Sequence, residues 1–334
     1  MLRCRRGTGE ERAAVSRSVV VIGNFDGVHP GHAEVLRRAR EIGHGLPVVV
    51  ITFWPHPASV VRPGRGPKLL TRLDERIALL KGAGAADVRV IDFTPAFAAK
   101  SPGDFVDEYV LPLHPAHVVV GENFRFGHKA AGNLATLAQL ADGRFDVVGL
   151  PLVTVGDEET CSSAVRAALD AGDVRHAAAL LGRPFRFTGT VRHGDHRGRE
   201  LGFPTANLPV PAELACPADG VYAGYLTRLD GRDAHGHGLP FGTPPPAWPA
   251  AISVGSNPTF NGVERRVETY VLDRDDLELY HAPIAVDFCQ RIRGQVKFEG
   301  IDALIAQMDD DVARSRTALA DHPCAASLRG PARR

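Results

Sequence analysis

The sequence predicts an α/β protein of two domains, an N-terminal parallel sheet with helices on both faces and a C-terminal antiparallel β-barrel followed by a helix. Three observations support this. Short β-branched runs alternate with helix-patterned segments through the first half, which is typical of parallel sheets built from crossover units. From residue 184 there is little helical periodicity until residue 301, and short strand-like runs replace it. A chain of 334 residues can also bury a core in each half.

The elements of the first half follow from hydrophobic spacing. Continuous apolar runs of strand length occur at residues 18–22, 47–53, 87–92, 117–120 and 146–150. Segments with helical spacing separate them at residues 30–42, 72–82, 102–109 and 133–142. A further helical segment, residues 162–181 with a break near Gly172, closes this half. We therefore expect a first domain of residues 1–183 and a second of residues 184–334.

The second half carries five strand-like runs and one helix. The runs are FRFTGTVRHG, GVYAGYL, AAISVG, RRVETYVLD and IAVDFCQRI, and the predicted helix covers residues 301–320. Residues 230–249 are rich in Gly, Pro and His, which predicts a loop between strands. His235 and His237 lie in this loop. Because no further ligand flanks them, a solvated loop is favoured over a metal site.

Composition disfavours several classes of protein. The formal net charge is 0 and the pI is about 7.3, so no overall basic field favours nucleic acid or an anionic membrane as a partner. No apolar run reaches the ~18 residues of a membrane-spanning helix, and the charged N-terminus lacks the apolar core of a secretory signal. The five dispersed cysteines argue against a disulfide framework. We expect a cytoplasmic protein that is a monomer or a weak homo-oligomer.

The first candidate site is the stretch GNFDGVHPGH, residues 23–32, which follows the first predicted strand. Pro30 suits the first position of a helix, so the free N–H groups at that helix start favour an anion. His29 and His32 are three residues apart and can face the same ligand, and Gly31 leaves room for a phosphate. A glycine-rich turn with two surface histidines fits the same residues. A zinc pair is disfavoured because no third ligand is evident.

The second candidate site is HGDHRGRELGFPTANL, residues 193–208. A Gly-Arg-x-x-Gly run suits a mobile loop that binds anions, and Phe203-Pro204 is a rigid extended bend. Thr205 and Asn207 lie two residues apart, so a strand presents both on one side. Their hydroxyl and amide oxygens suit a hard cation when substrate phosphates complete the shell. A turn followed by an edge strand fits these residues equally well.

Four stretches of the first half together resemble a known family. GNFDGVHPGH, TFWPHP (52–57), GENFRFGHKAAGN (121–133) and CSSAVRAAL (161–169) are similar, in order and spacing, to the adenylyltransferase half of the bifunctional prokaryotic FAD synthetases. His29-Pro30-Gly31-His32 resembles the H-x-G-H motif of the nucleotidyltransferase superfamily. The resemblance implies a Rossmann-like nucleotidyltransferase domain, in which the site lies at the carboxyl ends of the strands.

The resemblance also implies roles for individual residues of the first half. His29 and His32 would contact the ATP phosphates, and Arg166 would act with them in catalysis. The remaining nucleotide and flavin contacts would come from Gly23, Asn24, Phe25, Asp26, Gly31, His56, Asn123, Ser162 and Ser163. An FMN phosphate oxygen would attack the α-phosphorus of ATP and release pyrophosphate. The family usually has S-S-T-x-V/I-R where this chain has Cys161, Ser162 and Ser163, a departure that retains a hydroxyl.

The second half resembles the riboflavin kinases. The run from Gly198 matches their G-R-x-x-G-F-P-T-A-N motif, and DGVYAGYL, SVGSNPTF, VETYVLD and IRGQVKF follow in family order. The resemblance implies that Thr205 and Asn207 hold Mg²⁺ and that Glu268 is the general base. Nucleotide or flavin contacts would come from Gly198, Arg199, Gly202, Phe203, Pro204 and Arg293. Gln295 stands where family members often carry Glu.

These resemblances predict a bifunctional enzyme of flavin cofactor biosynthesis. It would phosphorylate riboflavin to FMN and then adenylylate FMN to FAD, using ATP with Mg²⁺ in both steps. FMN and FAD would be substrates or products rather than prosthetic groups, and riboflavin, FMN and ATP the small-molecule partners. Two alternatives remain open: a chain that retains only one activity, with the kinase favoured, and a flavin sensor without turnover.

Overall fold

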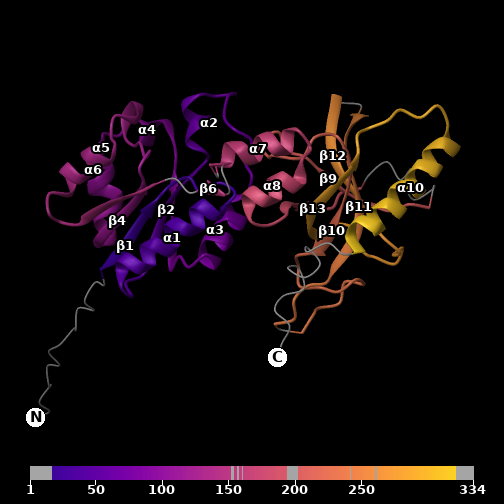
Figure 1. The fold of residues 1–334 in the computed structure, drawn as a ribbon, viewed down its shortest axis with the longest axis horizontal. Helices are drawn as coiled ribbons and strands as arrows, with labels where there is room; N and C mark the ends of the chain where they lie inside the picture. Colours follow the sequence, from indigo (N-terminus) through magenta and orange to yellow (C-terminus); the bar gives the residue numbers. More distant parts are fainter. Residues whose placement is uncertain are drawn as a thin grey trace, which may run out of the picture. The chain divides into compact units, whose positions relative to one another are not determined.

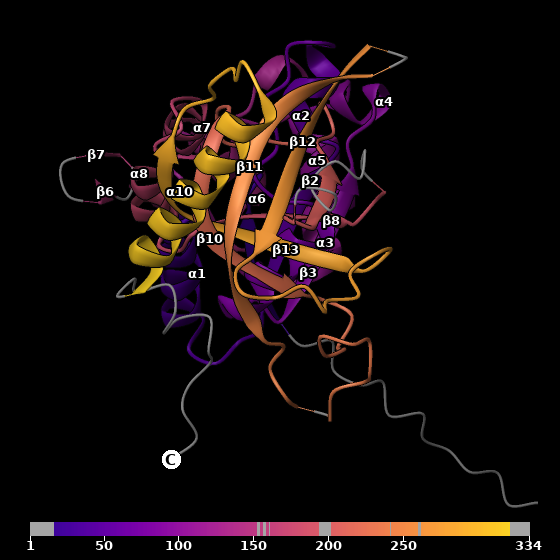
Figure 2. The same ribbon diagram turned by 90° about the vertical axis from the view of Figure 1, so that its right-hand side faces the viewer.

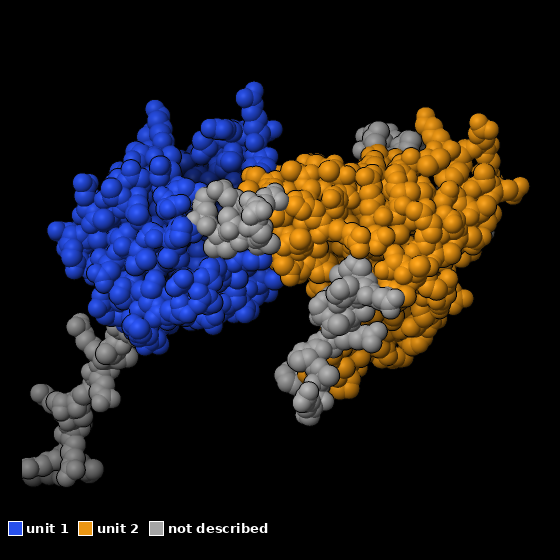
Figure 3. Space-filling view, in the orientation of Figure 1, with its two compact units in different colours: residues 1–67, 73–153 blue, residues 68–72, 154–334 orange. Residues whose placement is uncertain are grey.

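The computed structural model describes residues 17–151, 154–155, 158–159, 161–193, 202–240, 242–259 and 262–320. The chain forms two compact units (Figure 3): unit 1 comprises residues 1–67 and 73–153, and unit 2 comprises residues 68–72 and 154–334. The helical segment at residues 162–181 therefore groups with the second unit, whereas the sequence places it in the first functional domain. The functional boundary at residue 183 stays a prediction.

Unit 1 contains a five-stranded sheet in which all neighbouring strands are parallel, with the order β3-β2-β1-β4-β5. Figure 1 labels its strands β1, β2 and β4. The strands are β1 (Ser18–Ile22), β2 (Val48–Trp54), β3 (Asp87–Asp92), β4 (Pro115–Gly121) and β5 (Asp146–Leu150). After Ser18 the central strand β1 is an apolar run, and Val19, Val20 and Val21 are all 0% exposed. This continuous burial is expected of a strand covered on both faces.

Helices lie on both faces of this sheet. They are α1 (Pro30–Gly43), α2 (Pro57–Val61), α3 (Leu73–Gly82), α4 (Pro95–Ala98), α5 (Pro102–Phe105), the turns η1 (Val106–Val110), η2 (Leu111–Leu113) and η3 (His128–Ala130), and α6 (Leu134–Ala141). Alternate residues of β1 point to opposite faces. Val19 packs in one core with Leu36 of α1, and Val20 packs in the other with Leu137 of α6. The predicted α/β layering is confirmed.

One predicted helix has a different form. Residues 102–109 form a short α-helix that continues into the π-helical turn η1 and then the 3-10 turn η2. Pro112 lies inside η2. Since proline has no N–H and its ring clashes with the carbonyl four residues earlier, an α-helix cannot continue through it.

Unit 2 is built on a six-stranded antiparallel sheet with the order β8-β13-β10-β11-β12-β9. The strands are β8 (Phe185–Thr190), β9 (Thr205–Pro209), β10 (Gly220–Arg228), β11 (Ala247–Thr259), β12 (Gly262–Val271) and β13 (Pro283–Arg293). An isolated bridge between Arg192 and Asn207 brings the two edges of the sheet together. The sheet therefore curls into a partly closed barrel, as the sequence predicts.

Helices and a small hairpin complete unit 2. They are β6 (Thr154–Val155), β7 (Glu158–Glu159), α7 (Ser162–Asp170), α8 (Val174–Leu181) and α10 (Ile301–Ala320). The C-terminal helix α10 packs against β10, β11 and β13 (Figure 2). Within the described residues, no helix has the length and apolarity needed to cross a membrane.

Candidate active sites

The first site lies at the carboxyl edge of the parallel sheet in unit 1. The strand order changes direction between β1 and β4, and ligands of open α/β sheets bind at such a switch point. Asn24 follows β1, Asn123 follows β4, and His56 follows β2. Because these strands are neighbours and parallel, the structure brings three predicted site residues to one edge.

The loop of residues 23–32, which we call the histidine loop, presents His29 and His32 at the start of α1. His29 occupies the N-cap position in an extended conformation and Pro30 follows at the first helical position. The two imidazole rings stack with centroids 3.6 Å apart and an interplanar angle of 23°. The Phe25 ring meets His32 edge-on at 5.1 Å. Two imidazoles at a helix N-terminus, where Gly31 adds no side chain, form a donor set suited to phosphate oxygens.

His56 caps the neighbouring helix α2. Its Nδ1 accepts a hydrogen bond from the backbone N–H of Ala58 at 3.1 Å. When Nδ1 is an acceptor, the neutral ring carries its proton on Nε2. The cap therefore fixes both the orientation and the tautomer of this histidine and makes Nε2–H the donor that it presents.

Two predicted contacts of the histidine loop, Phe25 and Asp26, have buried side chains. Phe25 is 3% exposed and Asp26 is 2% exposed. The Asp26 carboxylate accepts a hydrogen bond from Arg76 at 3.0 Å within a buried ion pair. A Cβ at Gly23 would lie 2.8 Å from the Phe25 ring, so glycine is required there. The buried side chains of Phe25 and Asp26 support the loop from its inner side. A ligand would contact the backbone of these residues and the side chains next to them.

The predicted phosphate ligands Ser162, Ser163 and Arg166 lie on α7, within unit 2. Cys161 is the N-cap residue and Ser162 is the first helical residue, so both serines are close to the positive end of the helix dipole. The Arg166 Nε donates a hydrogen bond to the Lys68 carbonyl at 2.6 Å. This contact ties the arginine to residues 68–72, the short segment that also belongs to unit 2.

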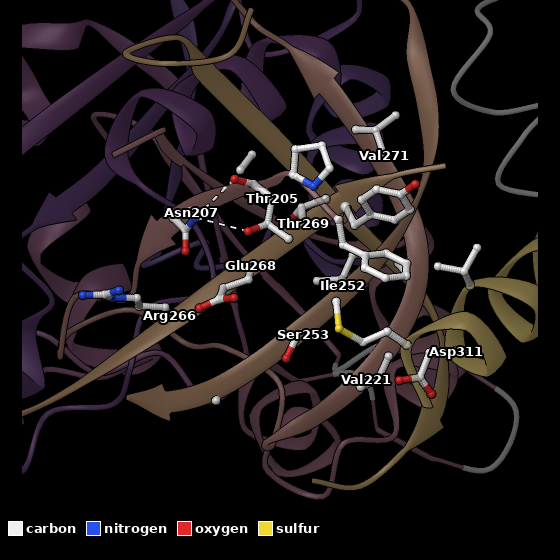
Figure 4. Close-up of a pocket in the computed structure, with 18 of the residues that line it drawn as sticks. Thr205, Asn207, Val221, Ile252, Ser253, Arg266, Glu268, Thr269, Val271 and Asp311 are labelled. Atoms are coloured by element: carbon white, nitrogen blue, oxygen red, sulfur yellow. Dashed lines mark hydrogen bonds between the residues drawn. The ribbon is translucent and has the colours of Figure 1, made fainter. Parts of the chain in front are cut away.

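The second site is a cavity of about 740 Å³ in the barrel of unit 2, lined by residues of β9, β11, β12 and α10 (Figure 4). We call it the barrel cavity. In the strand register Glu268 is opposite Asn207 on one side and opposite Ser253 on the other. Directly opposed residues of an antiparallel pair share a face, with Cβ atoms about 5 Å apart. The sheet therefore gathers these three polar side chains at one end of the cavity.

Thr205 and Asn207 form the polar pair that the sequence predicts. The Asn207 Nδ2 donates to the Thr205 carbonyl at 3.2 Å and to the Thr205 Oγ1 at 3.4 Å (Figure 4). Asn207 is 9% exposed. Because the amide nitrogen is engaged with Thr205, the amide oxygen is the atom that the side chain presents elsewhere, as a cation ligand requires.

The other end of the barrel cavity is mainly apolar, with the Asp311 carboxylate beside Val221 (Figure 4). It is lined by Val221, Ile252, Val271, Phe298, Leu304 and Met308. Phe203 and Pro204 also line the cavity, and the Phe203 ring packs edge-on against Tyr270 at 5.3 Å. Gly202 has a positive φ of 86°, a conformation that favours glycine. Gly198 and Arg199 lie outside the described residues.

Arg293 lines the barrel cavity but is engaged by the C-terminal helix. Its Nε and Nη2 donate to the two carboxylate oxygens of Asp311 at 2.8 and 2.6 Å. Gln295 donates to the Val254 carbonyl at 2.9 Å. The contacts of both residues are thus with the walls of the cavity, and the predicted flavin contact of Arg293 stays a prediction.

Some lining residues are absent from the sequence-based prediction. Arg266 lies two residues before Glu268 on β12, its side chain is 13% exposed, and it pairs with Glu264 at 2.8 Å. Strand alternation alone places Arg266 and Glu268 on one face, so this residue could have been found. Asp311 of this cavity, and Arg76 beneath the histidine loop, could not have been found, because their partners are distant in the sequence.

A parallel nucleotide-binding sheet with a histidine loop, followed by a barrel whose polar cavity contains a carboxylate, defines a two-part transferase. Family models agree with this class: that for FAD synthetase matches residues 11–164 and that for riboflavin kinase matches residues 181–319. The chain belongs to the family of bifunctional riboflavin kinase/FMN adenylyltransferases. The family, the fold class and both enzyme activities predicted from the sequence are thereby confirmed.

Curated relatives support this over nearly the whole chain. The Listeria monocytogenes bifunctional riboflavin kinase/FMN adenylyltransferase is 36% identical over 89% of this chain and 91% of its own length. The Bacillus subtilis enzyme is 35% identical over 90% of this chain and 92% of its own length. The Escherichia coli enzyme is 34% identical over 89% of this chain and 91% of its own length. A solved structure from Streptococcus pneumoniae, titled as a macrolide-efflux protein, has a TM-score of 0.77 at 32% identity. It covers 90% of this chain and 94% of its own.

Proposed function

We propose that the histidine loop of unit 1 carries adenylyl transfer to FMN and that the barrel cavity of unit 2 carries phosphoryl transfer to riboflavin. The observation that supports the division most strongly is the strand register of the barrel, which sets Glu268 beside Asn207 inside a cavity with one polar and one apolar end. The apolar end suits a planar aromatic ring system, and the polar end suits phosphates and a hydroxyl.

Glu268 acts as the general base of the kinase reaction. It takes the proton from the ribityl hydroxyl as that oxygen attacks the γ-phosphorus of ATP, and ADP leaves. Thr205 and Asn207 fit a magnesium ion because both offer oxygen donors and their mutual hydrogen bond turns the Asn207 amide oxygen outward. When bound, the ion would neutralise charge on the phosphates.

His29 and His32 act as hydrogen-bond donors to the polyphosphate of ATP in the adenylylation of FMN. His56 adds a donor through Nε2–H. Ser162 and Ser163 at the N-terminal end of α7, and Arg166 one turn further along the helix, are the phosphate ligands that the family resemblance implies. An FMN phosphate oxygen attacks the α-phosphorus of ATP and pyrophosphate leaves. The reaction needs alignment and charge neutralisation and no protein nucleophile.

Variants that alter only one of the two sites test whether the two reactions are carried by separate sites. We expect Glu268→Gln to lower FMN formation from riboflavin at least 100-fold, because an amide cannot accept the proton, while FAD formation from supplied FMN stays within twofold of wild type. The double variant His29→Ala, His32→Ala should show the reverse. Chromatography that separates riboflavin, FMN and FAD measures both reactions. A folded variant that loses both activities would contradict the division.

The same assay measures both activities in one reaction. We expect wild-type protein supplied with riboflavin, ATP and Mg²⁺ to form FMN first and then FAD, which neither a chain with the kinase activity alone nor a flavin sensor would do. We also propose that the protein is cytoplasmic, is a monomer or weak homo-oligomer, and has no nucleic-acid or membrane partner. The neutral net charge and the dispersed cysteines support this proposal. Light scattering of the purified protein tests the oligomeric state.

A further inference from the structure

A fully buried arginine lies beneath the histidine loop. Arg76 of α3 is 0% exposed, and its guanidinium carbon lies 5.5 Å from the centroid of the Trp54 ring. Its Nη2 donates to the Asp26 Oδ1 at 3.0 Å, and its Nη1 donates to the Asn24 carbonyl at 3.1 Å. One side chain thus contacts two residues of the loop.

Further contacts fix the same part of the loop. The Thr52 hydroxyl, also 0% exposed, donates to the Asn24 carbonyl at 3.0 Å. The Gly23 N–H donates to the Ile51 carbonyl at 3.1 Å. Residues of β2 and α3 therefore fix the main chain at Asn24 together. This fixes the position from which the Asn24 side chain extends.

The loop has a backbone conformation that needs such support. Phe25, Gly27 and Val28 have φ values of 51°, 84° and 41°. Only glycine adopts this left-handed region without cost, and a β-branched residue such as valine is rare there. Strained conformations persist where the surroundings fix them, and they gather at functional sites. Asp26 lies between Phe25 and Gly27, and its contact with Arg76 anchors this part of the loop.

A buried ion pair adds little stability compared with apolar residues of the same shape, because both charges lose their hydration. Its place beneath the strained part of the histidine loop, just before His29, gives it another use. We propose that Arg76 and Asp26 are a positioning pair, which holds the histidine loop so that His29 and His32 meet the phosphates during adenylyl transfer. This proposal rests on the function proposed above for the two histidines.

The test uses full-length variants and steady-state kinetics of both reactions. In Arg76→Met we expect kcat for FMN adenylylation to fall about 100-fold and KM for ATP to rise, since small displacements of aligned groups cost about that factor. Riboflavin phosphorylation in the same chain should stay within twofold. Arg76→Lys keeps the charge but cannot reach Asp26 and Asn24 with a fork of donors, so an intermediate loss of about tenfold is expected. Lys81→Met, which removes an exposed cation from the same helix, is the matched control and should behave as wild type.

A second variant separates positioning from folding. Asp26→Leu with Arg76→Met removes both charges, so we expect it to unfold at a higher temperature than Arg76→Met alone. Its kcat for adenylylation should stay at least tenfold below wild type. The proposal is overturned if this double variant is as stable and as active as wild type. It is also overturned if Arg76→Met lowers kcat without changing KM for ATP, because a fraction of unfolded enzyme would do that.

The variant His29→Ala, measured alongside, separates this proposal from the proposed function. If His29→Ala adenylylates FMN like wild type, the role of the histidine loop itself is wrong. If His29→Ala is impaired while the Arg76 and Asp26 variants are not, the loop role stands and the positioning pair is wrong.

Discussion

Glu268 shows how a single residue acquires its role from its position on a strand. Nothing in the side chain distinguishes it from Glu264 four residues earlier, which pairs with Arg266 at a 41% exposed position. The register sets Glu268 between Asn207 and Ser253 inside the barrel cavity. A carboxylate that lines the cavity beside Asn207 has the position that the proposed general base requires.

Two buried titratable residues make unit 2 sensitive to alkali. Burial raises the pKa of the Cys216 thiol from an ordinary 9.0 to about 12 and that of the Tyr222 hydroxyl from 10.0 to about 12. Above pH 9 the unfolded chain therefore releases protons that the folded chain retains. These two groups therefore leave the free energy of unfolding at its full value below pH 9. They lower it as the pH rises toward 12, by up to about 1.4 kcal/mol per pH unit for each group.

Urea unfolding at pH 8.0, 9.5 and 10.5 measures this effect, and we expect the free energy of unfolding of unit 2 to fall across the series. Cys216→Ala should reduce the slope, because it removes one of the two groups. A free energy that is constant or rises with pH in the wild-type protein would contradict the assignment.

Residues whose chemistry is local could be predicted from the sequence, and residues whose role is tertiary could not. His29 and His32 lie at the start of a helix that Pro30 marks. Thr205 and Asn207 are two residues apart on a strand, so both lie on the same face. Arg76 lies on a helix among other charged residues, where a solvated role is the ordinary expectation. Only the fold brings it to Asp26, fifty positions away in sequence.

At the scale of elements, α10 closes one side of the barrel cavity. It contributes Leu304 and Met308 to the apolar end, and its main polar link to the sheet is the bidentate pair of Asp311 with Arg293, whose side chains are 7% and 15% exposed. Arg314 adds a hydrogen bond to the Ile292 carbonyl at 2.6 Å. These contacts hold the helix against the end of β13.

We predict that Asp311→Asn raises KM for riboflavin about tenfold and changes FAD formation from supplied FMN by less than twofold. The amide cannot form the charged bidentate pair, and hydrogen bonds to charged groups contribute about 1.5–3 kcal/mol each. Steady-state kinetics of both reactions measure the effect. Asp310→Asn is the matched control, because Asp310 is exposed and pairs with Arg314 at 3.5 Å. Equal effects of the two substitutions would contradict a role for the Asp311 pair.

Element prediction succeeded where the hydrophobic period was clear. The strands of the parallel sheet and α10 follow from periods that burial enforces. The segment at residues 102–109 shows the limit: its apolar spacing is helical, but Pro112 converts the end of the segment into π and 3-10 turns. The grouping of α7 with unit 2 was equally hidden, because it depends on packing between elements distant in sequence: α7 packs on α8, and α8 packs on β8 and β13.

At the scale of the whole molecule, two compact units with separate cores correspond to two family models in one chain. The product of the proposed kinase site, FMN, is the substrate of the proposed adenylyltransferase site. If the histidine loop and the barrel cavity carry separate chemistries, a chain that lacks one activity can be complemented by a chain that lacks the other.

Mixing two inactivated variants tests this most directly. Glu268→Gln and the double variant His29→Ala, His32→Ala are each given riboflavin, ATP and Mg²⁺, alone and in equimolar mixture, and the flavins are separated by chromatography. We predict that Glu268→Gln alone leaves riboflavin unchanged, that the double histidine variant alone accumulates FMN, and that the mixture forms FAD. Formation of FAD by either variant alone, or none in a mixture that forms FMN, would contradict two separable sites.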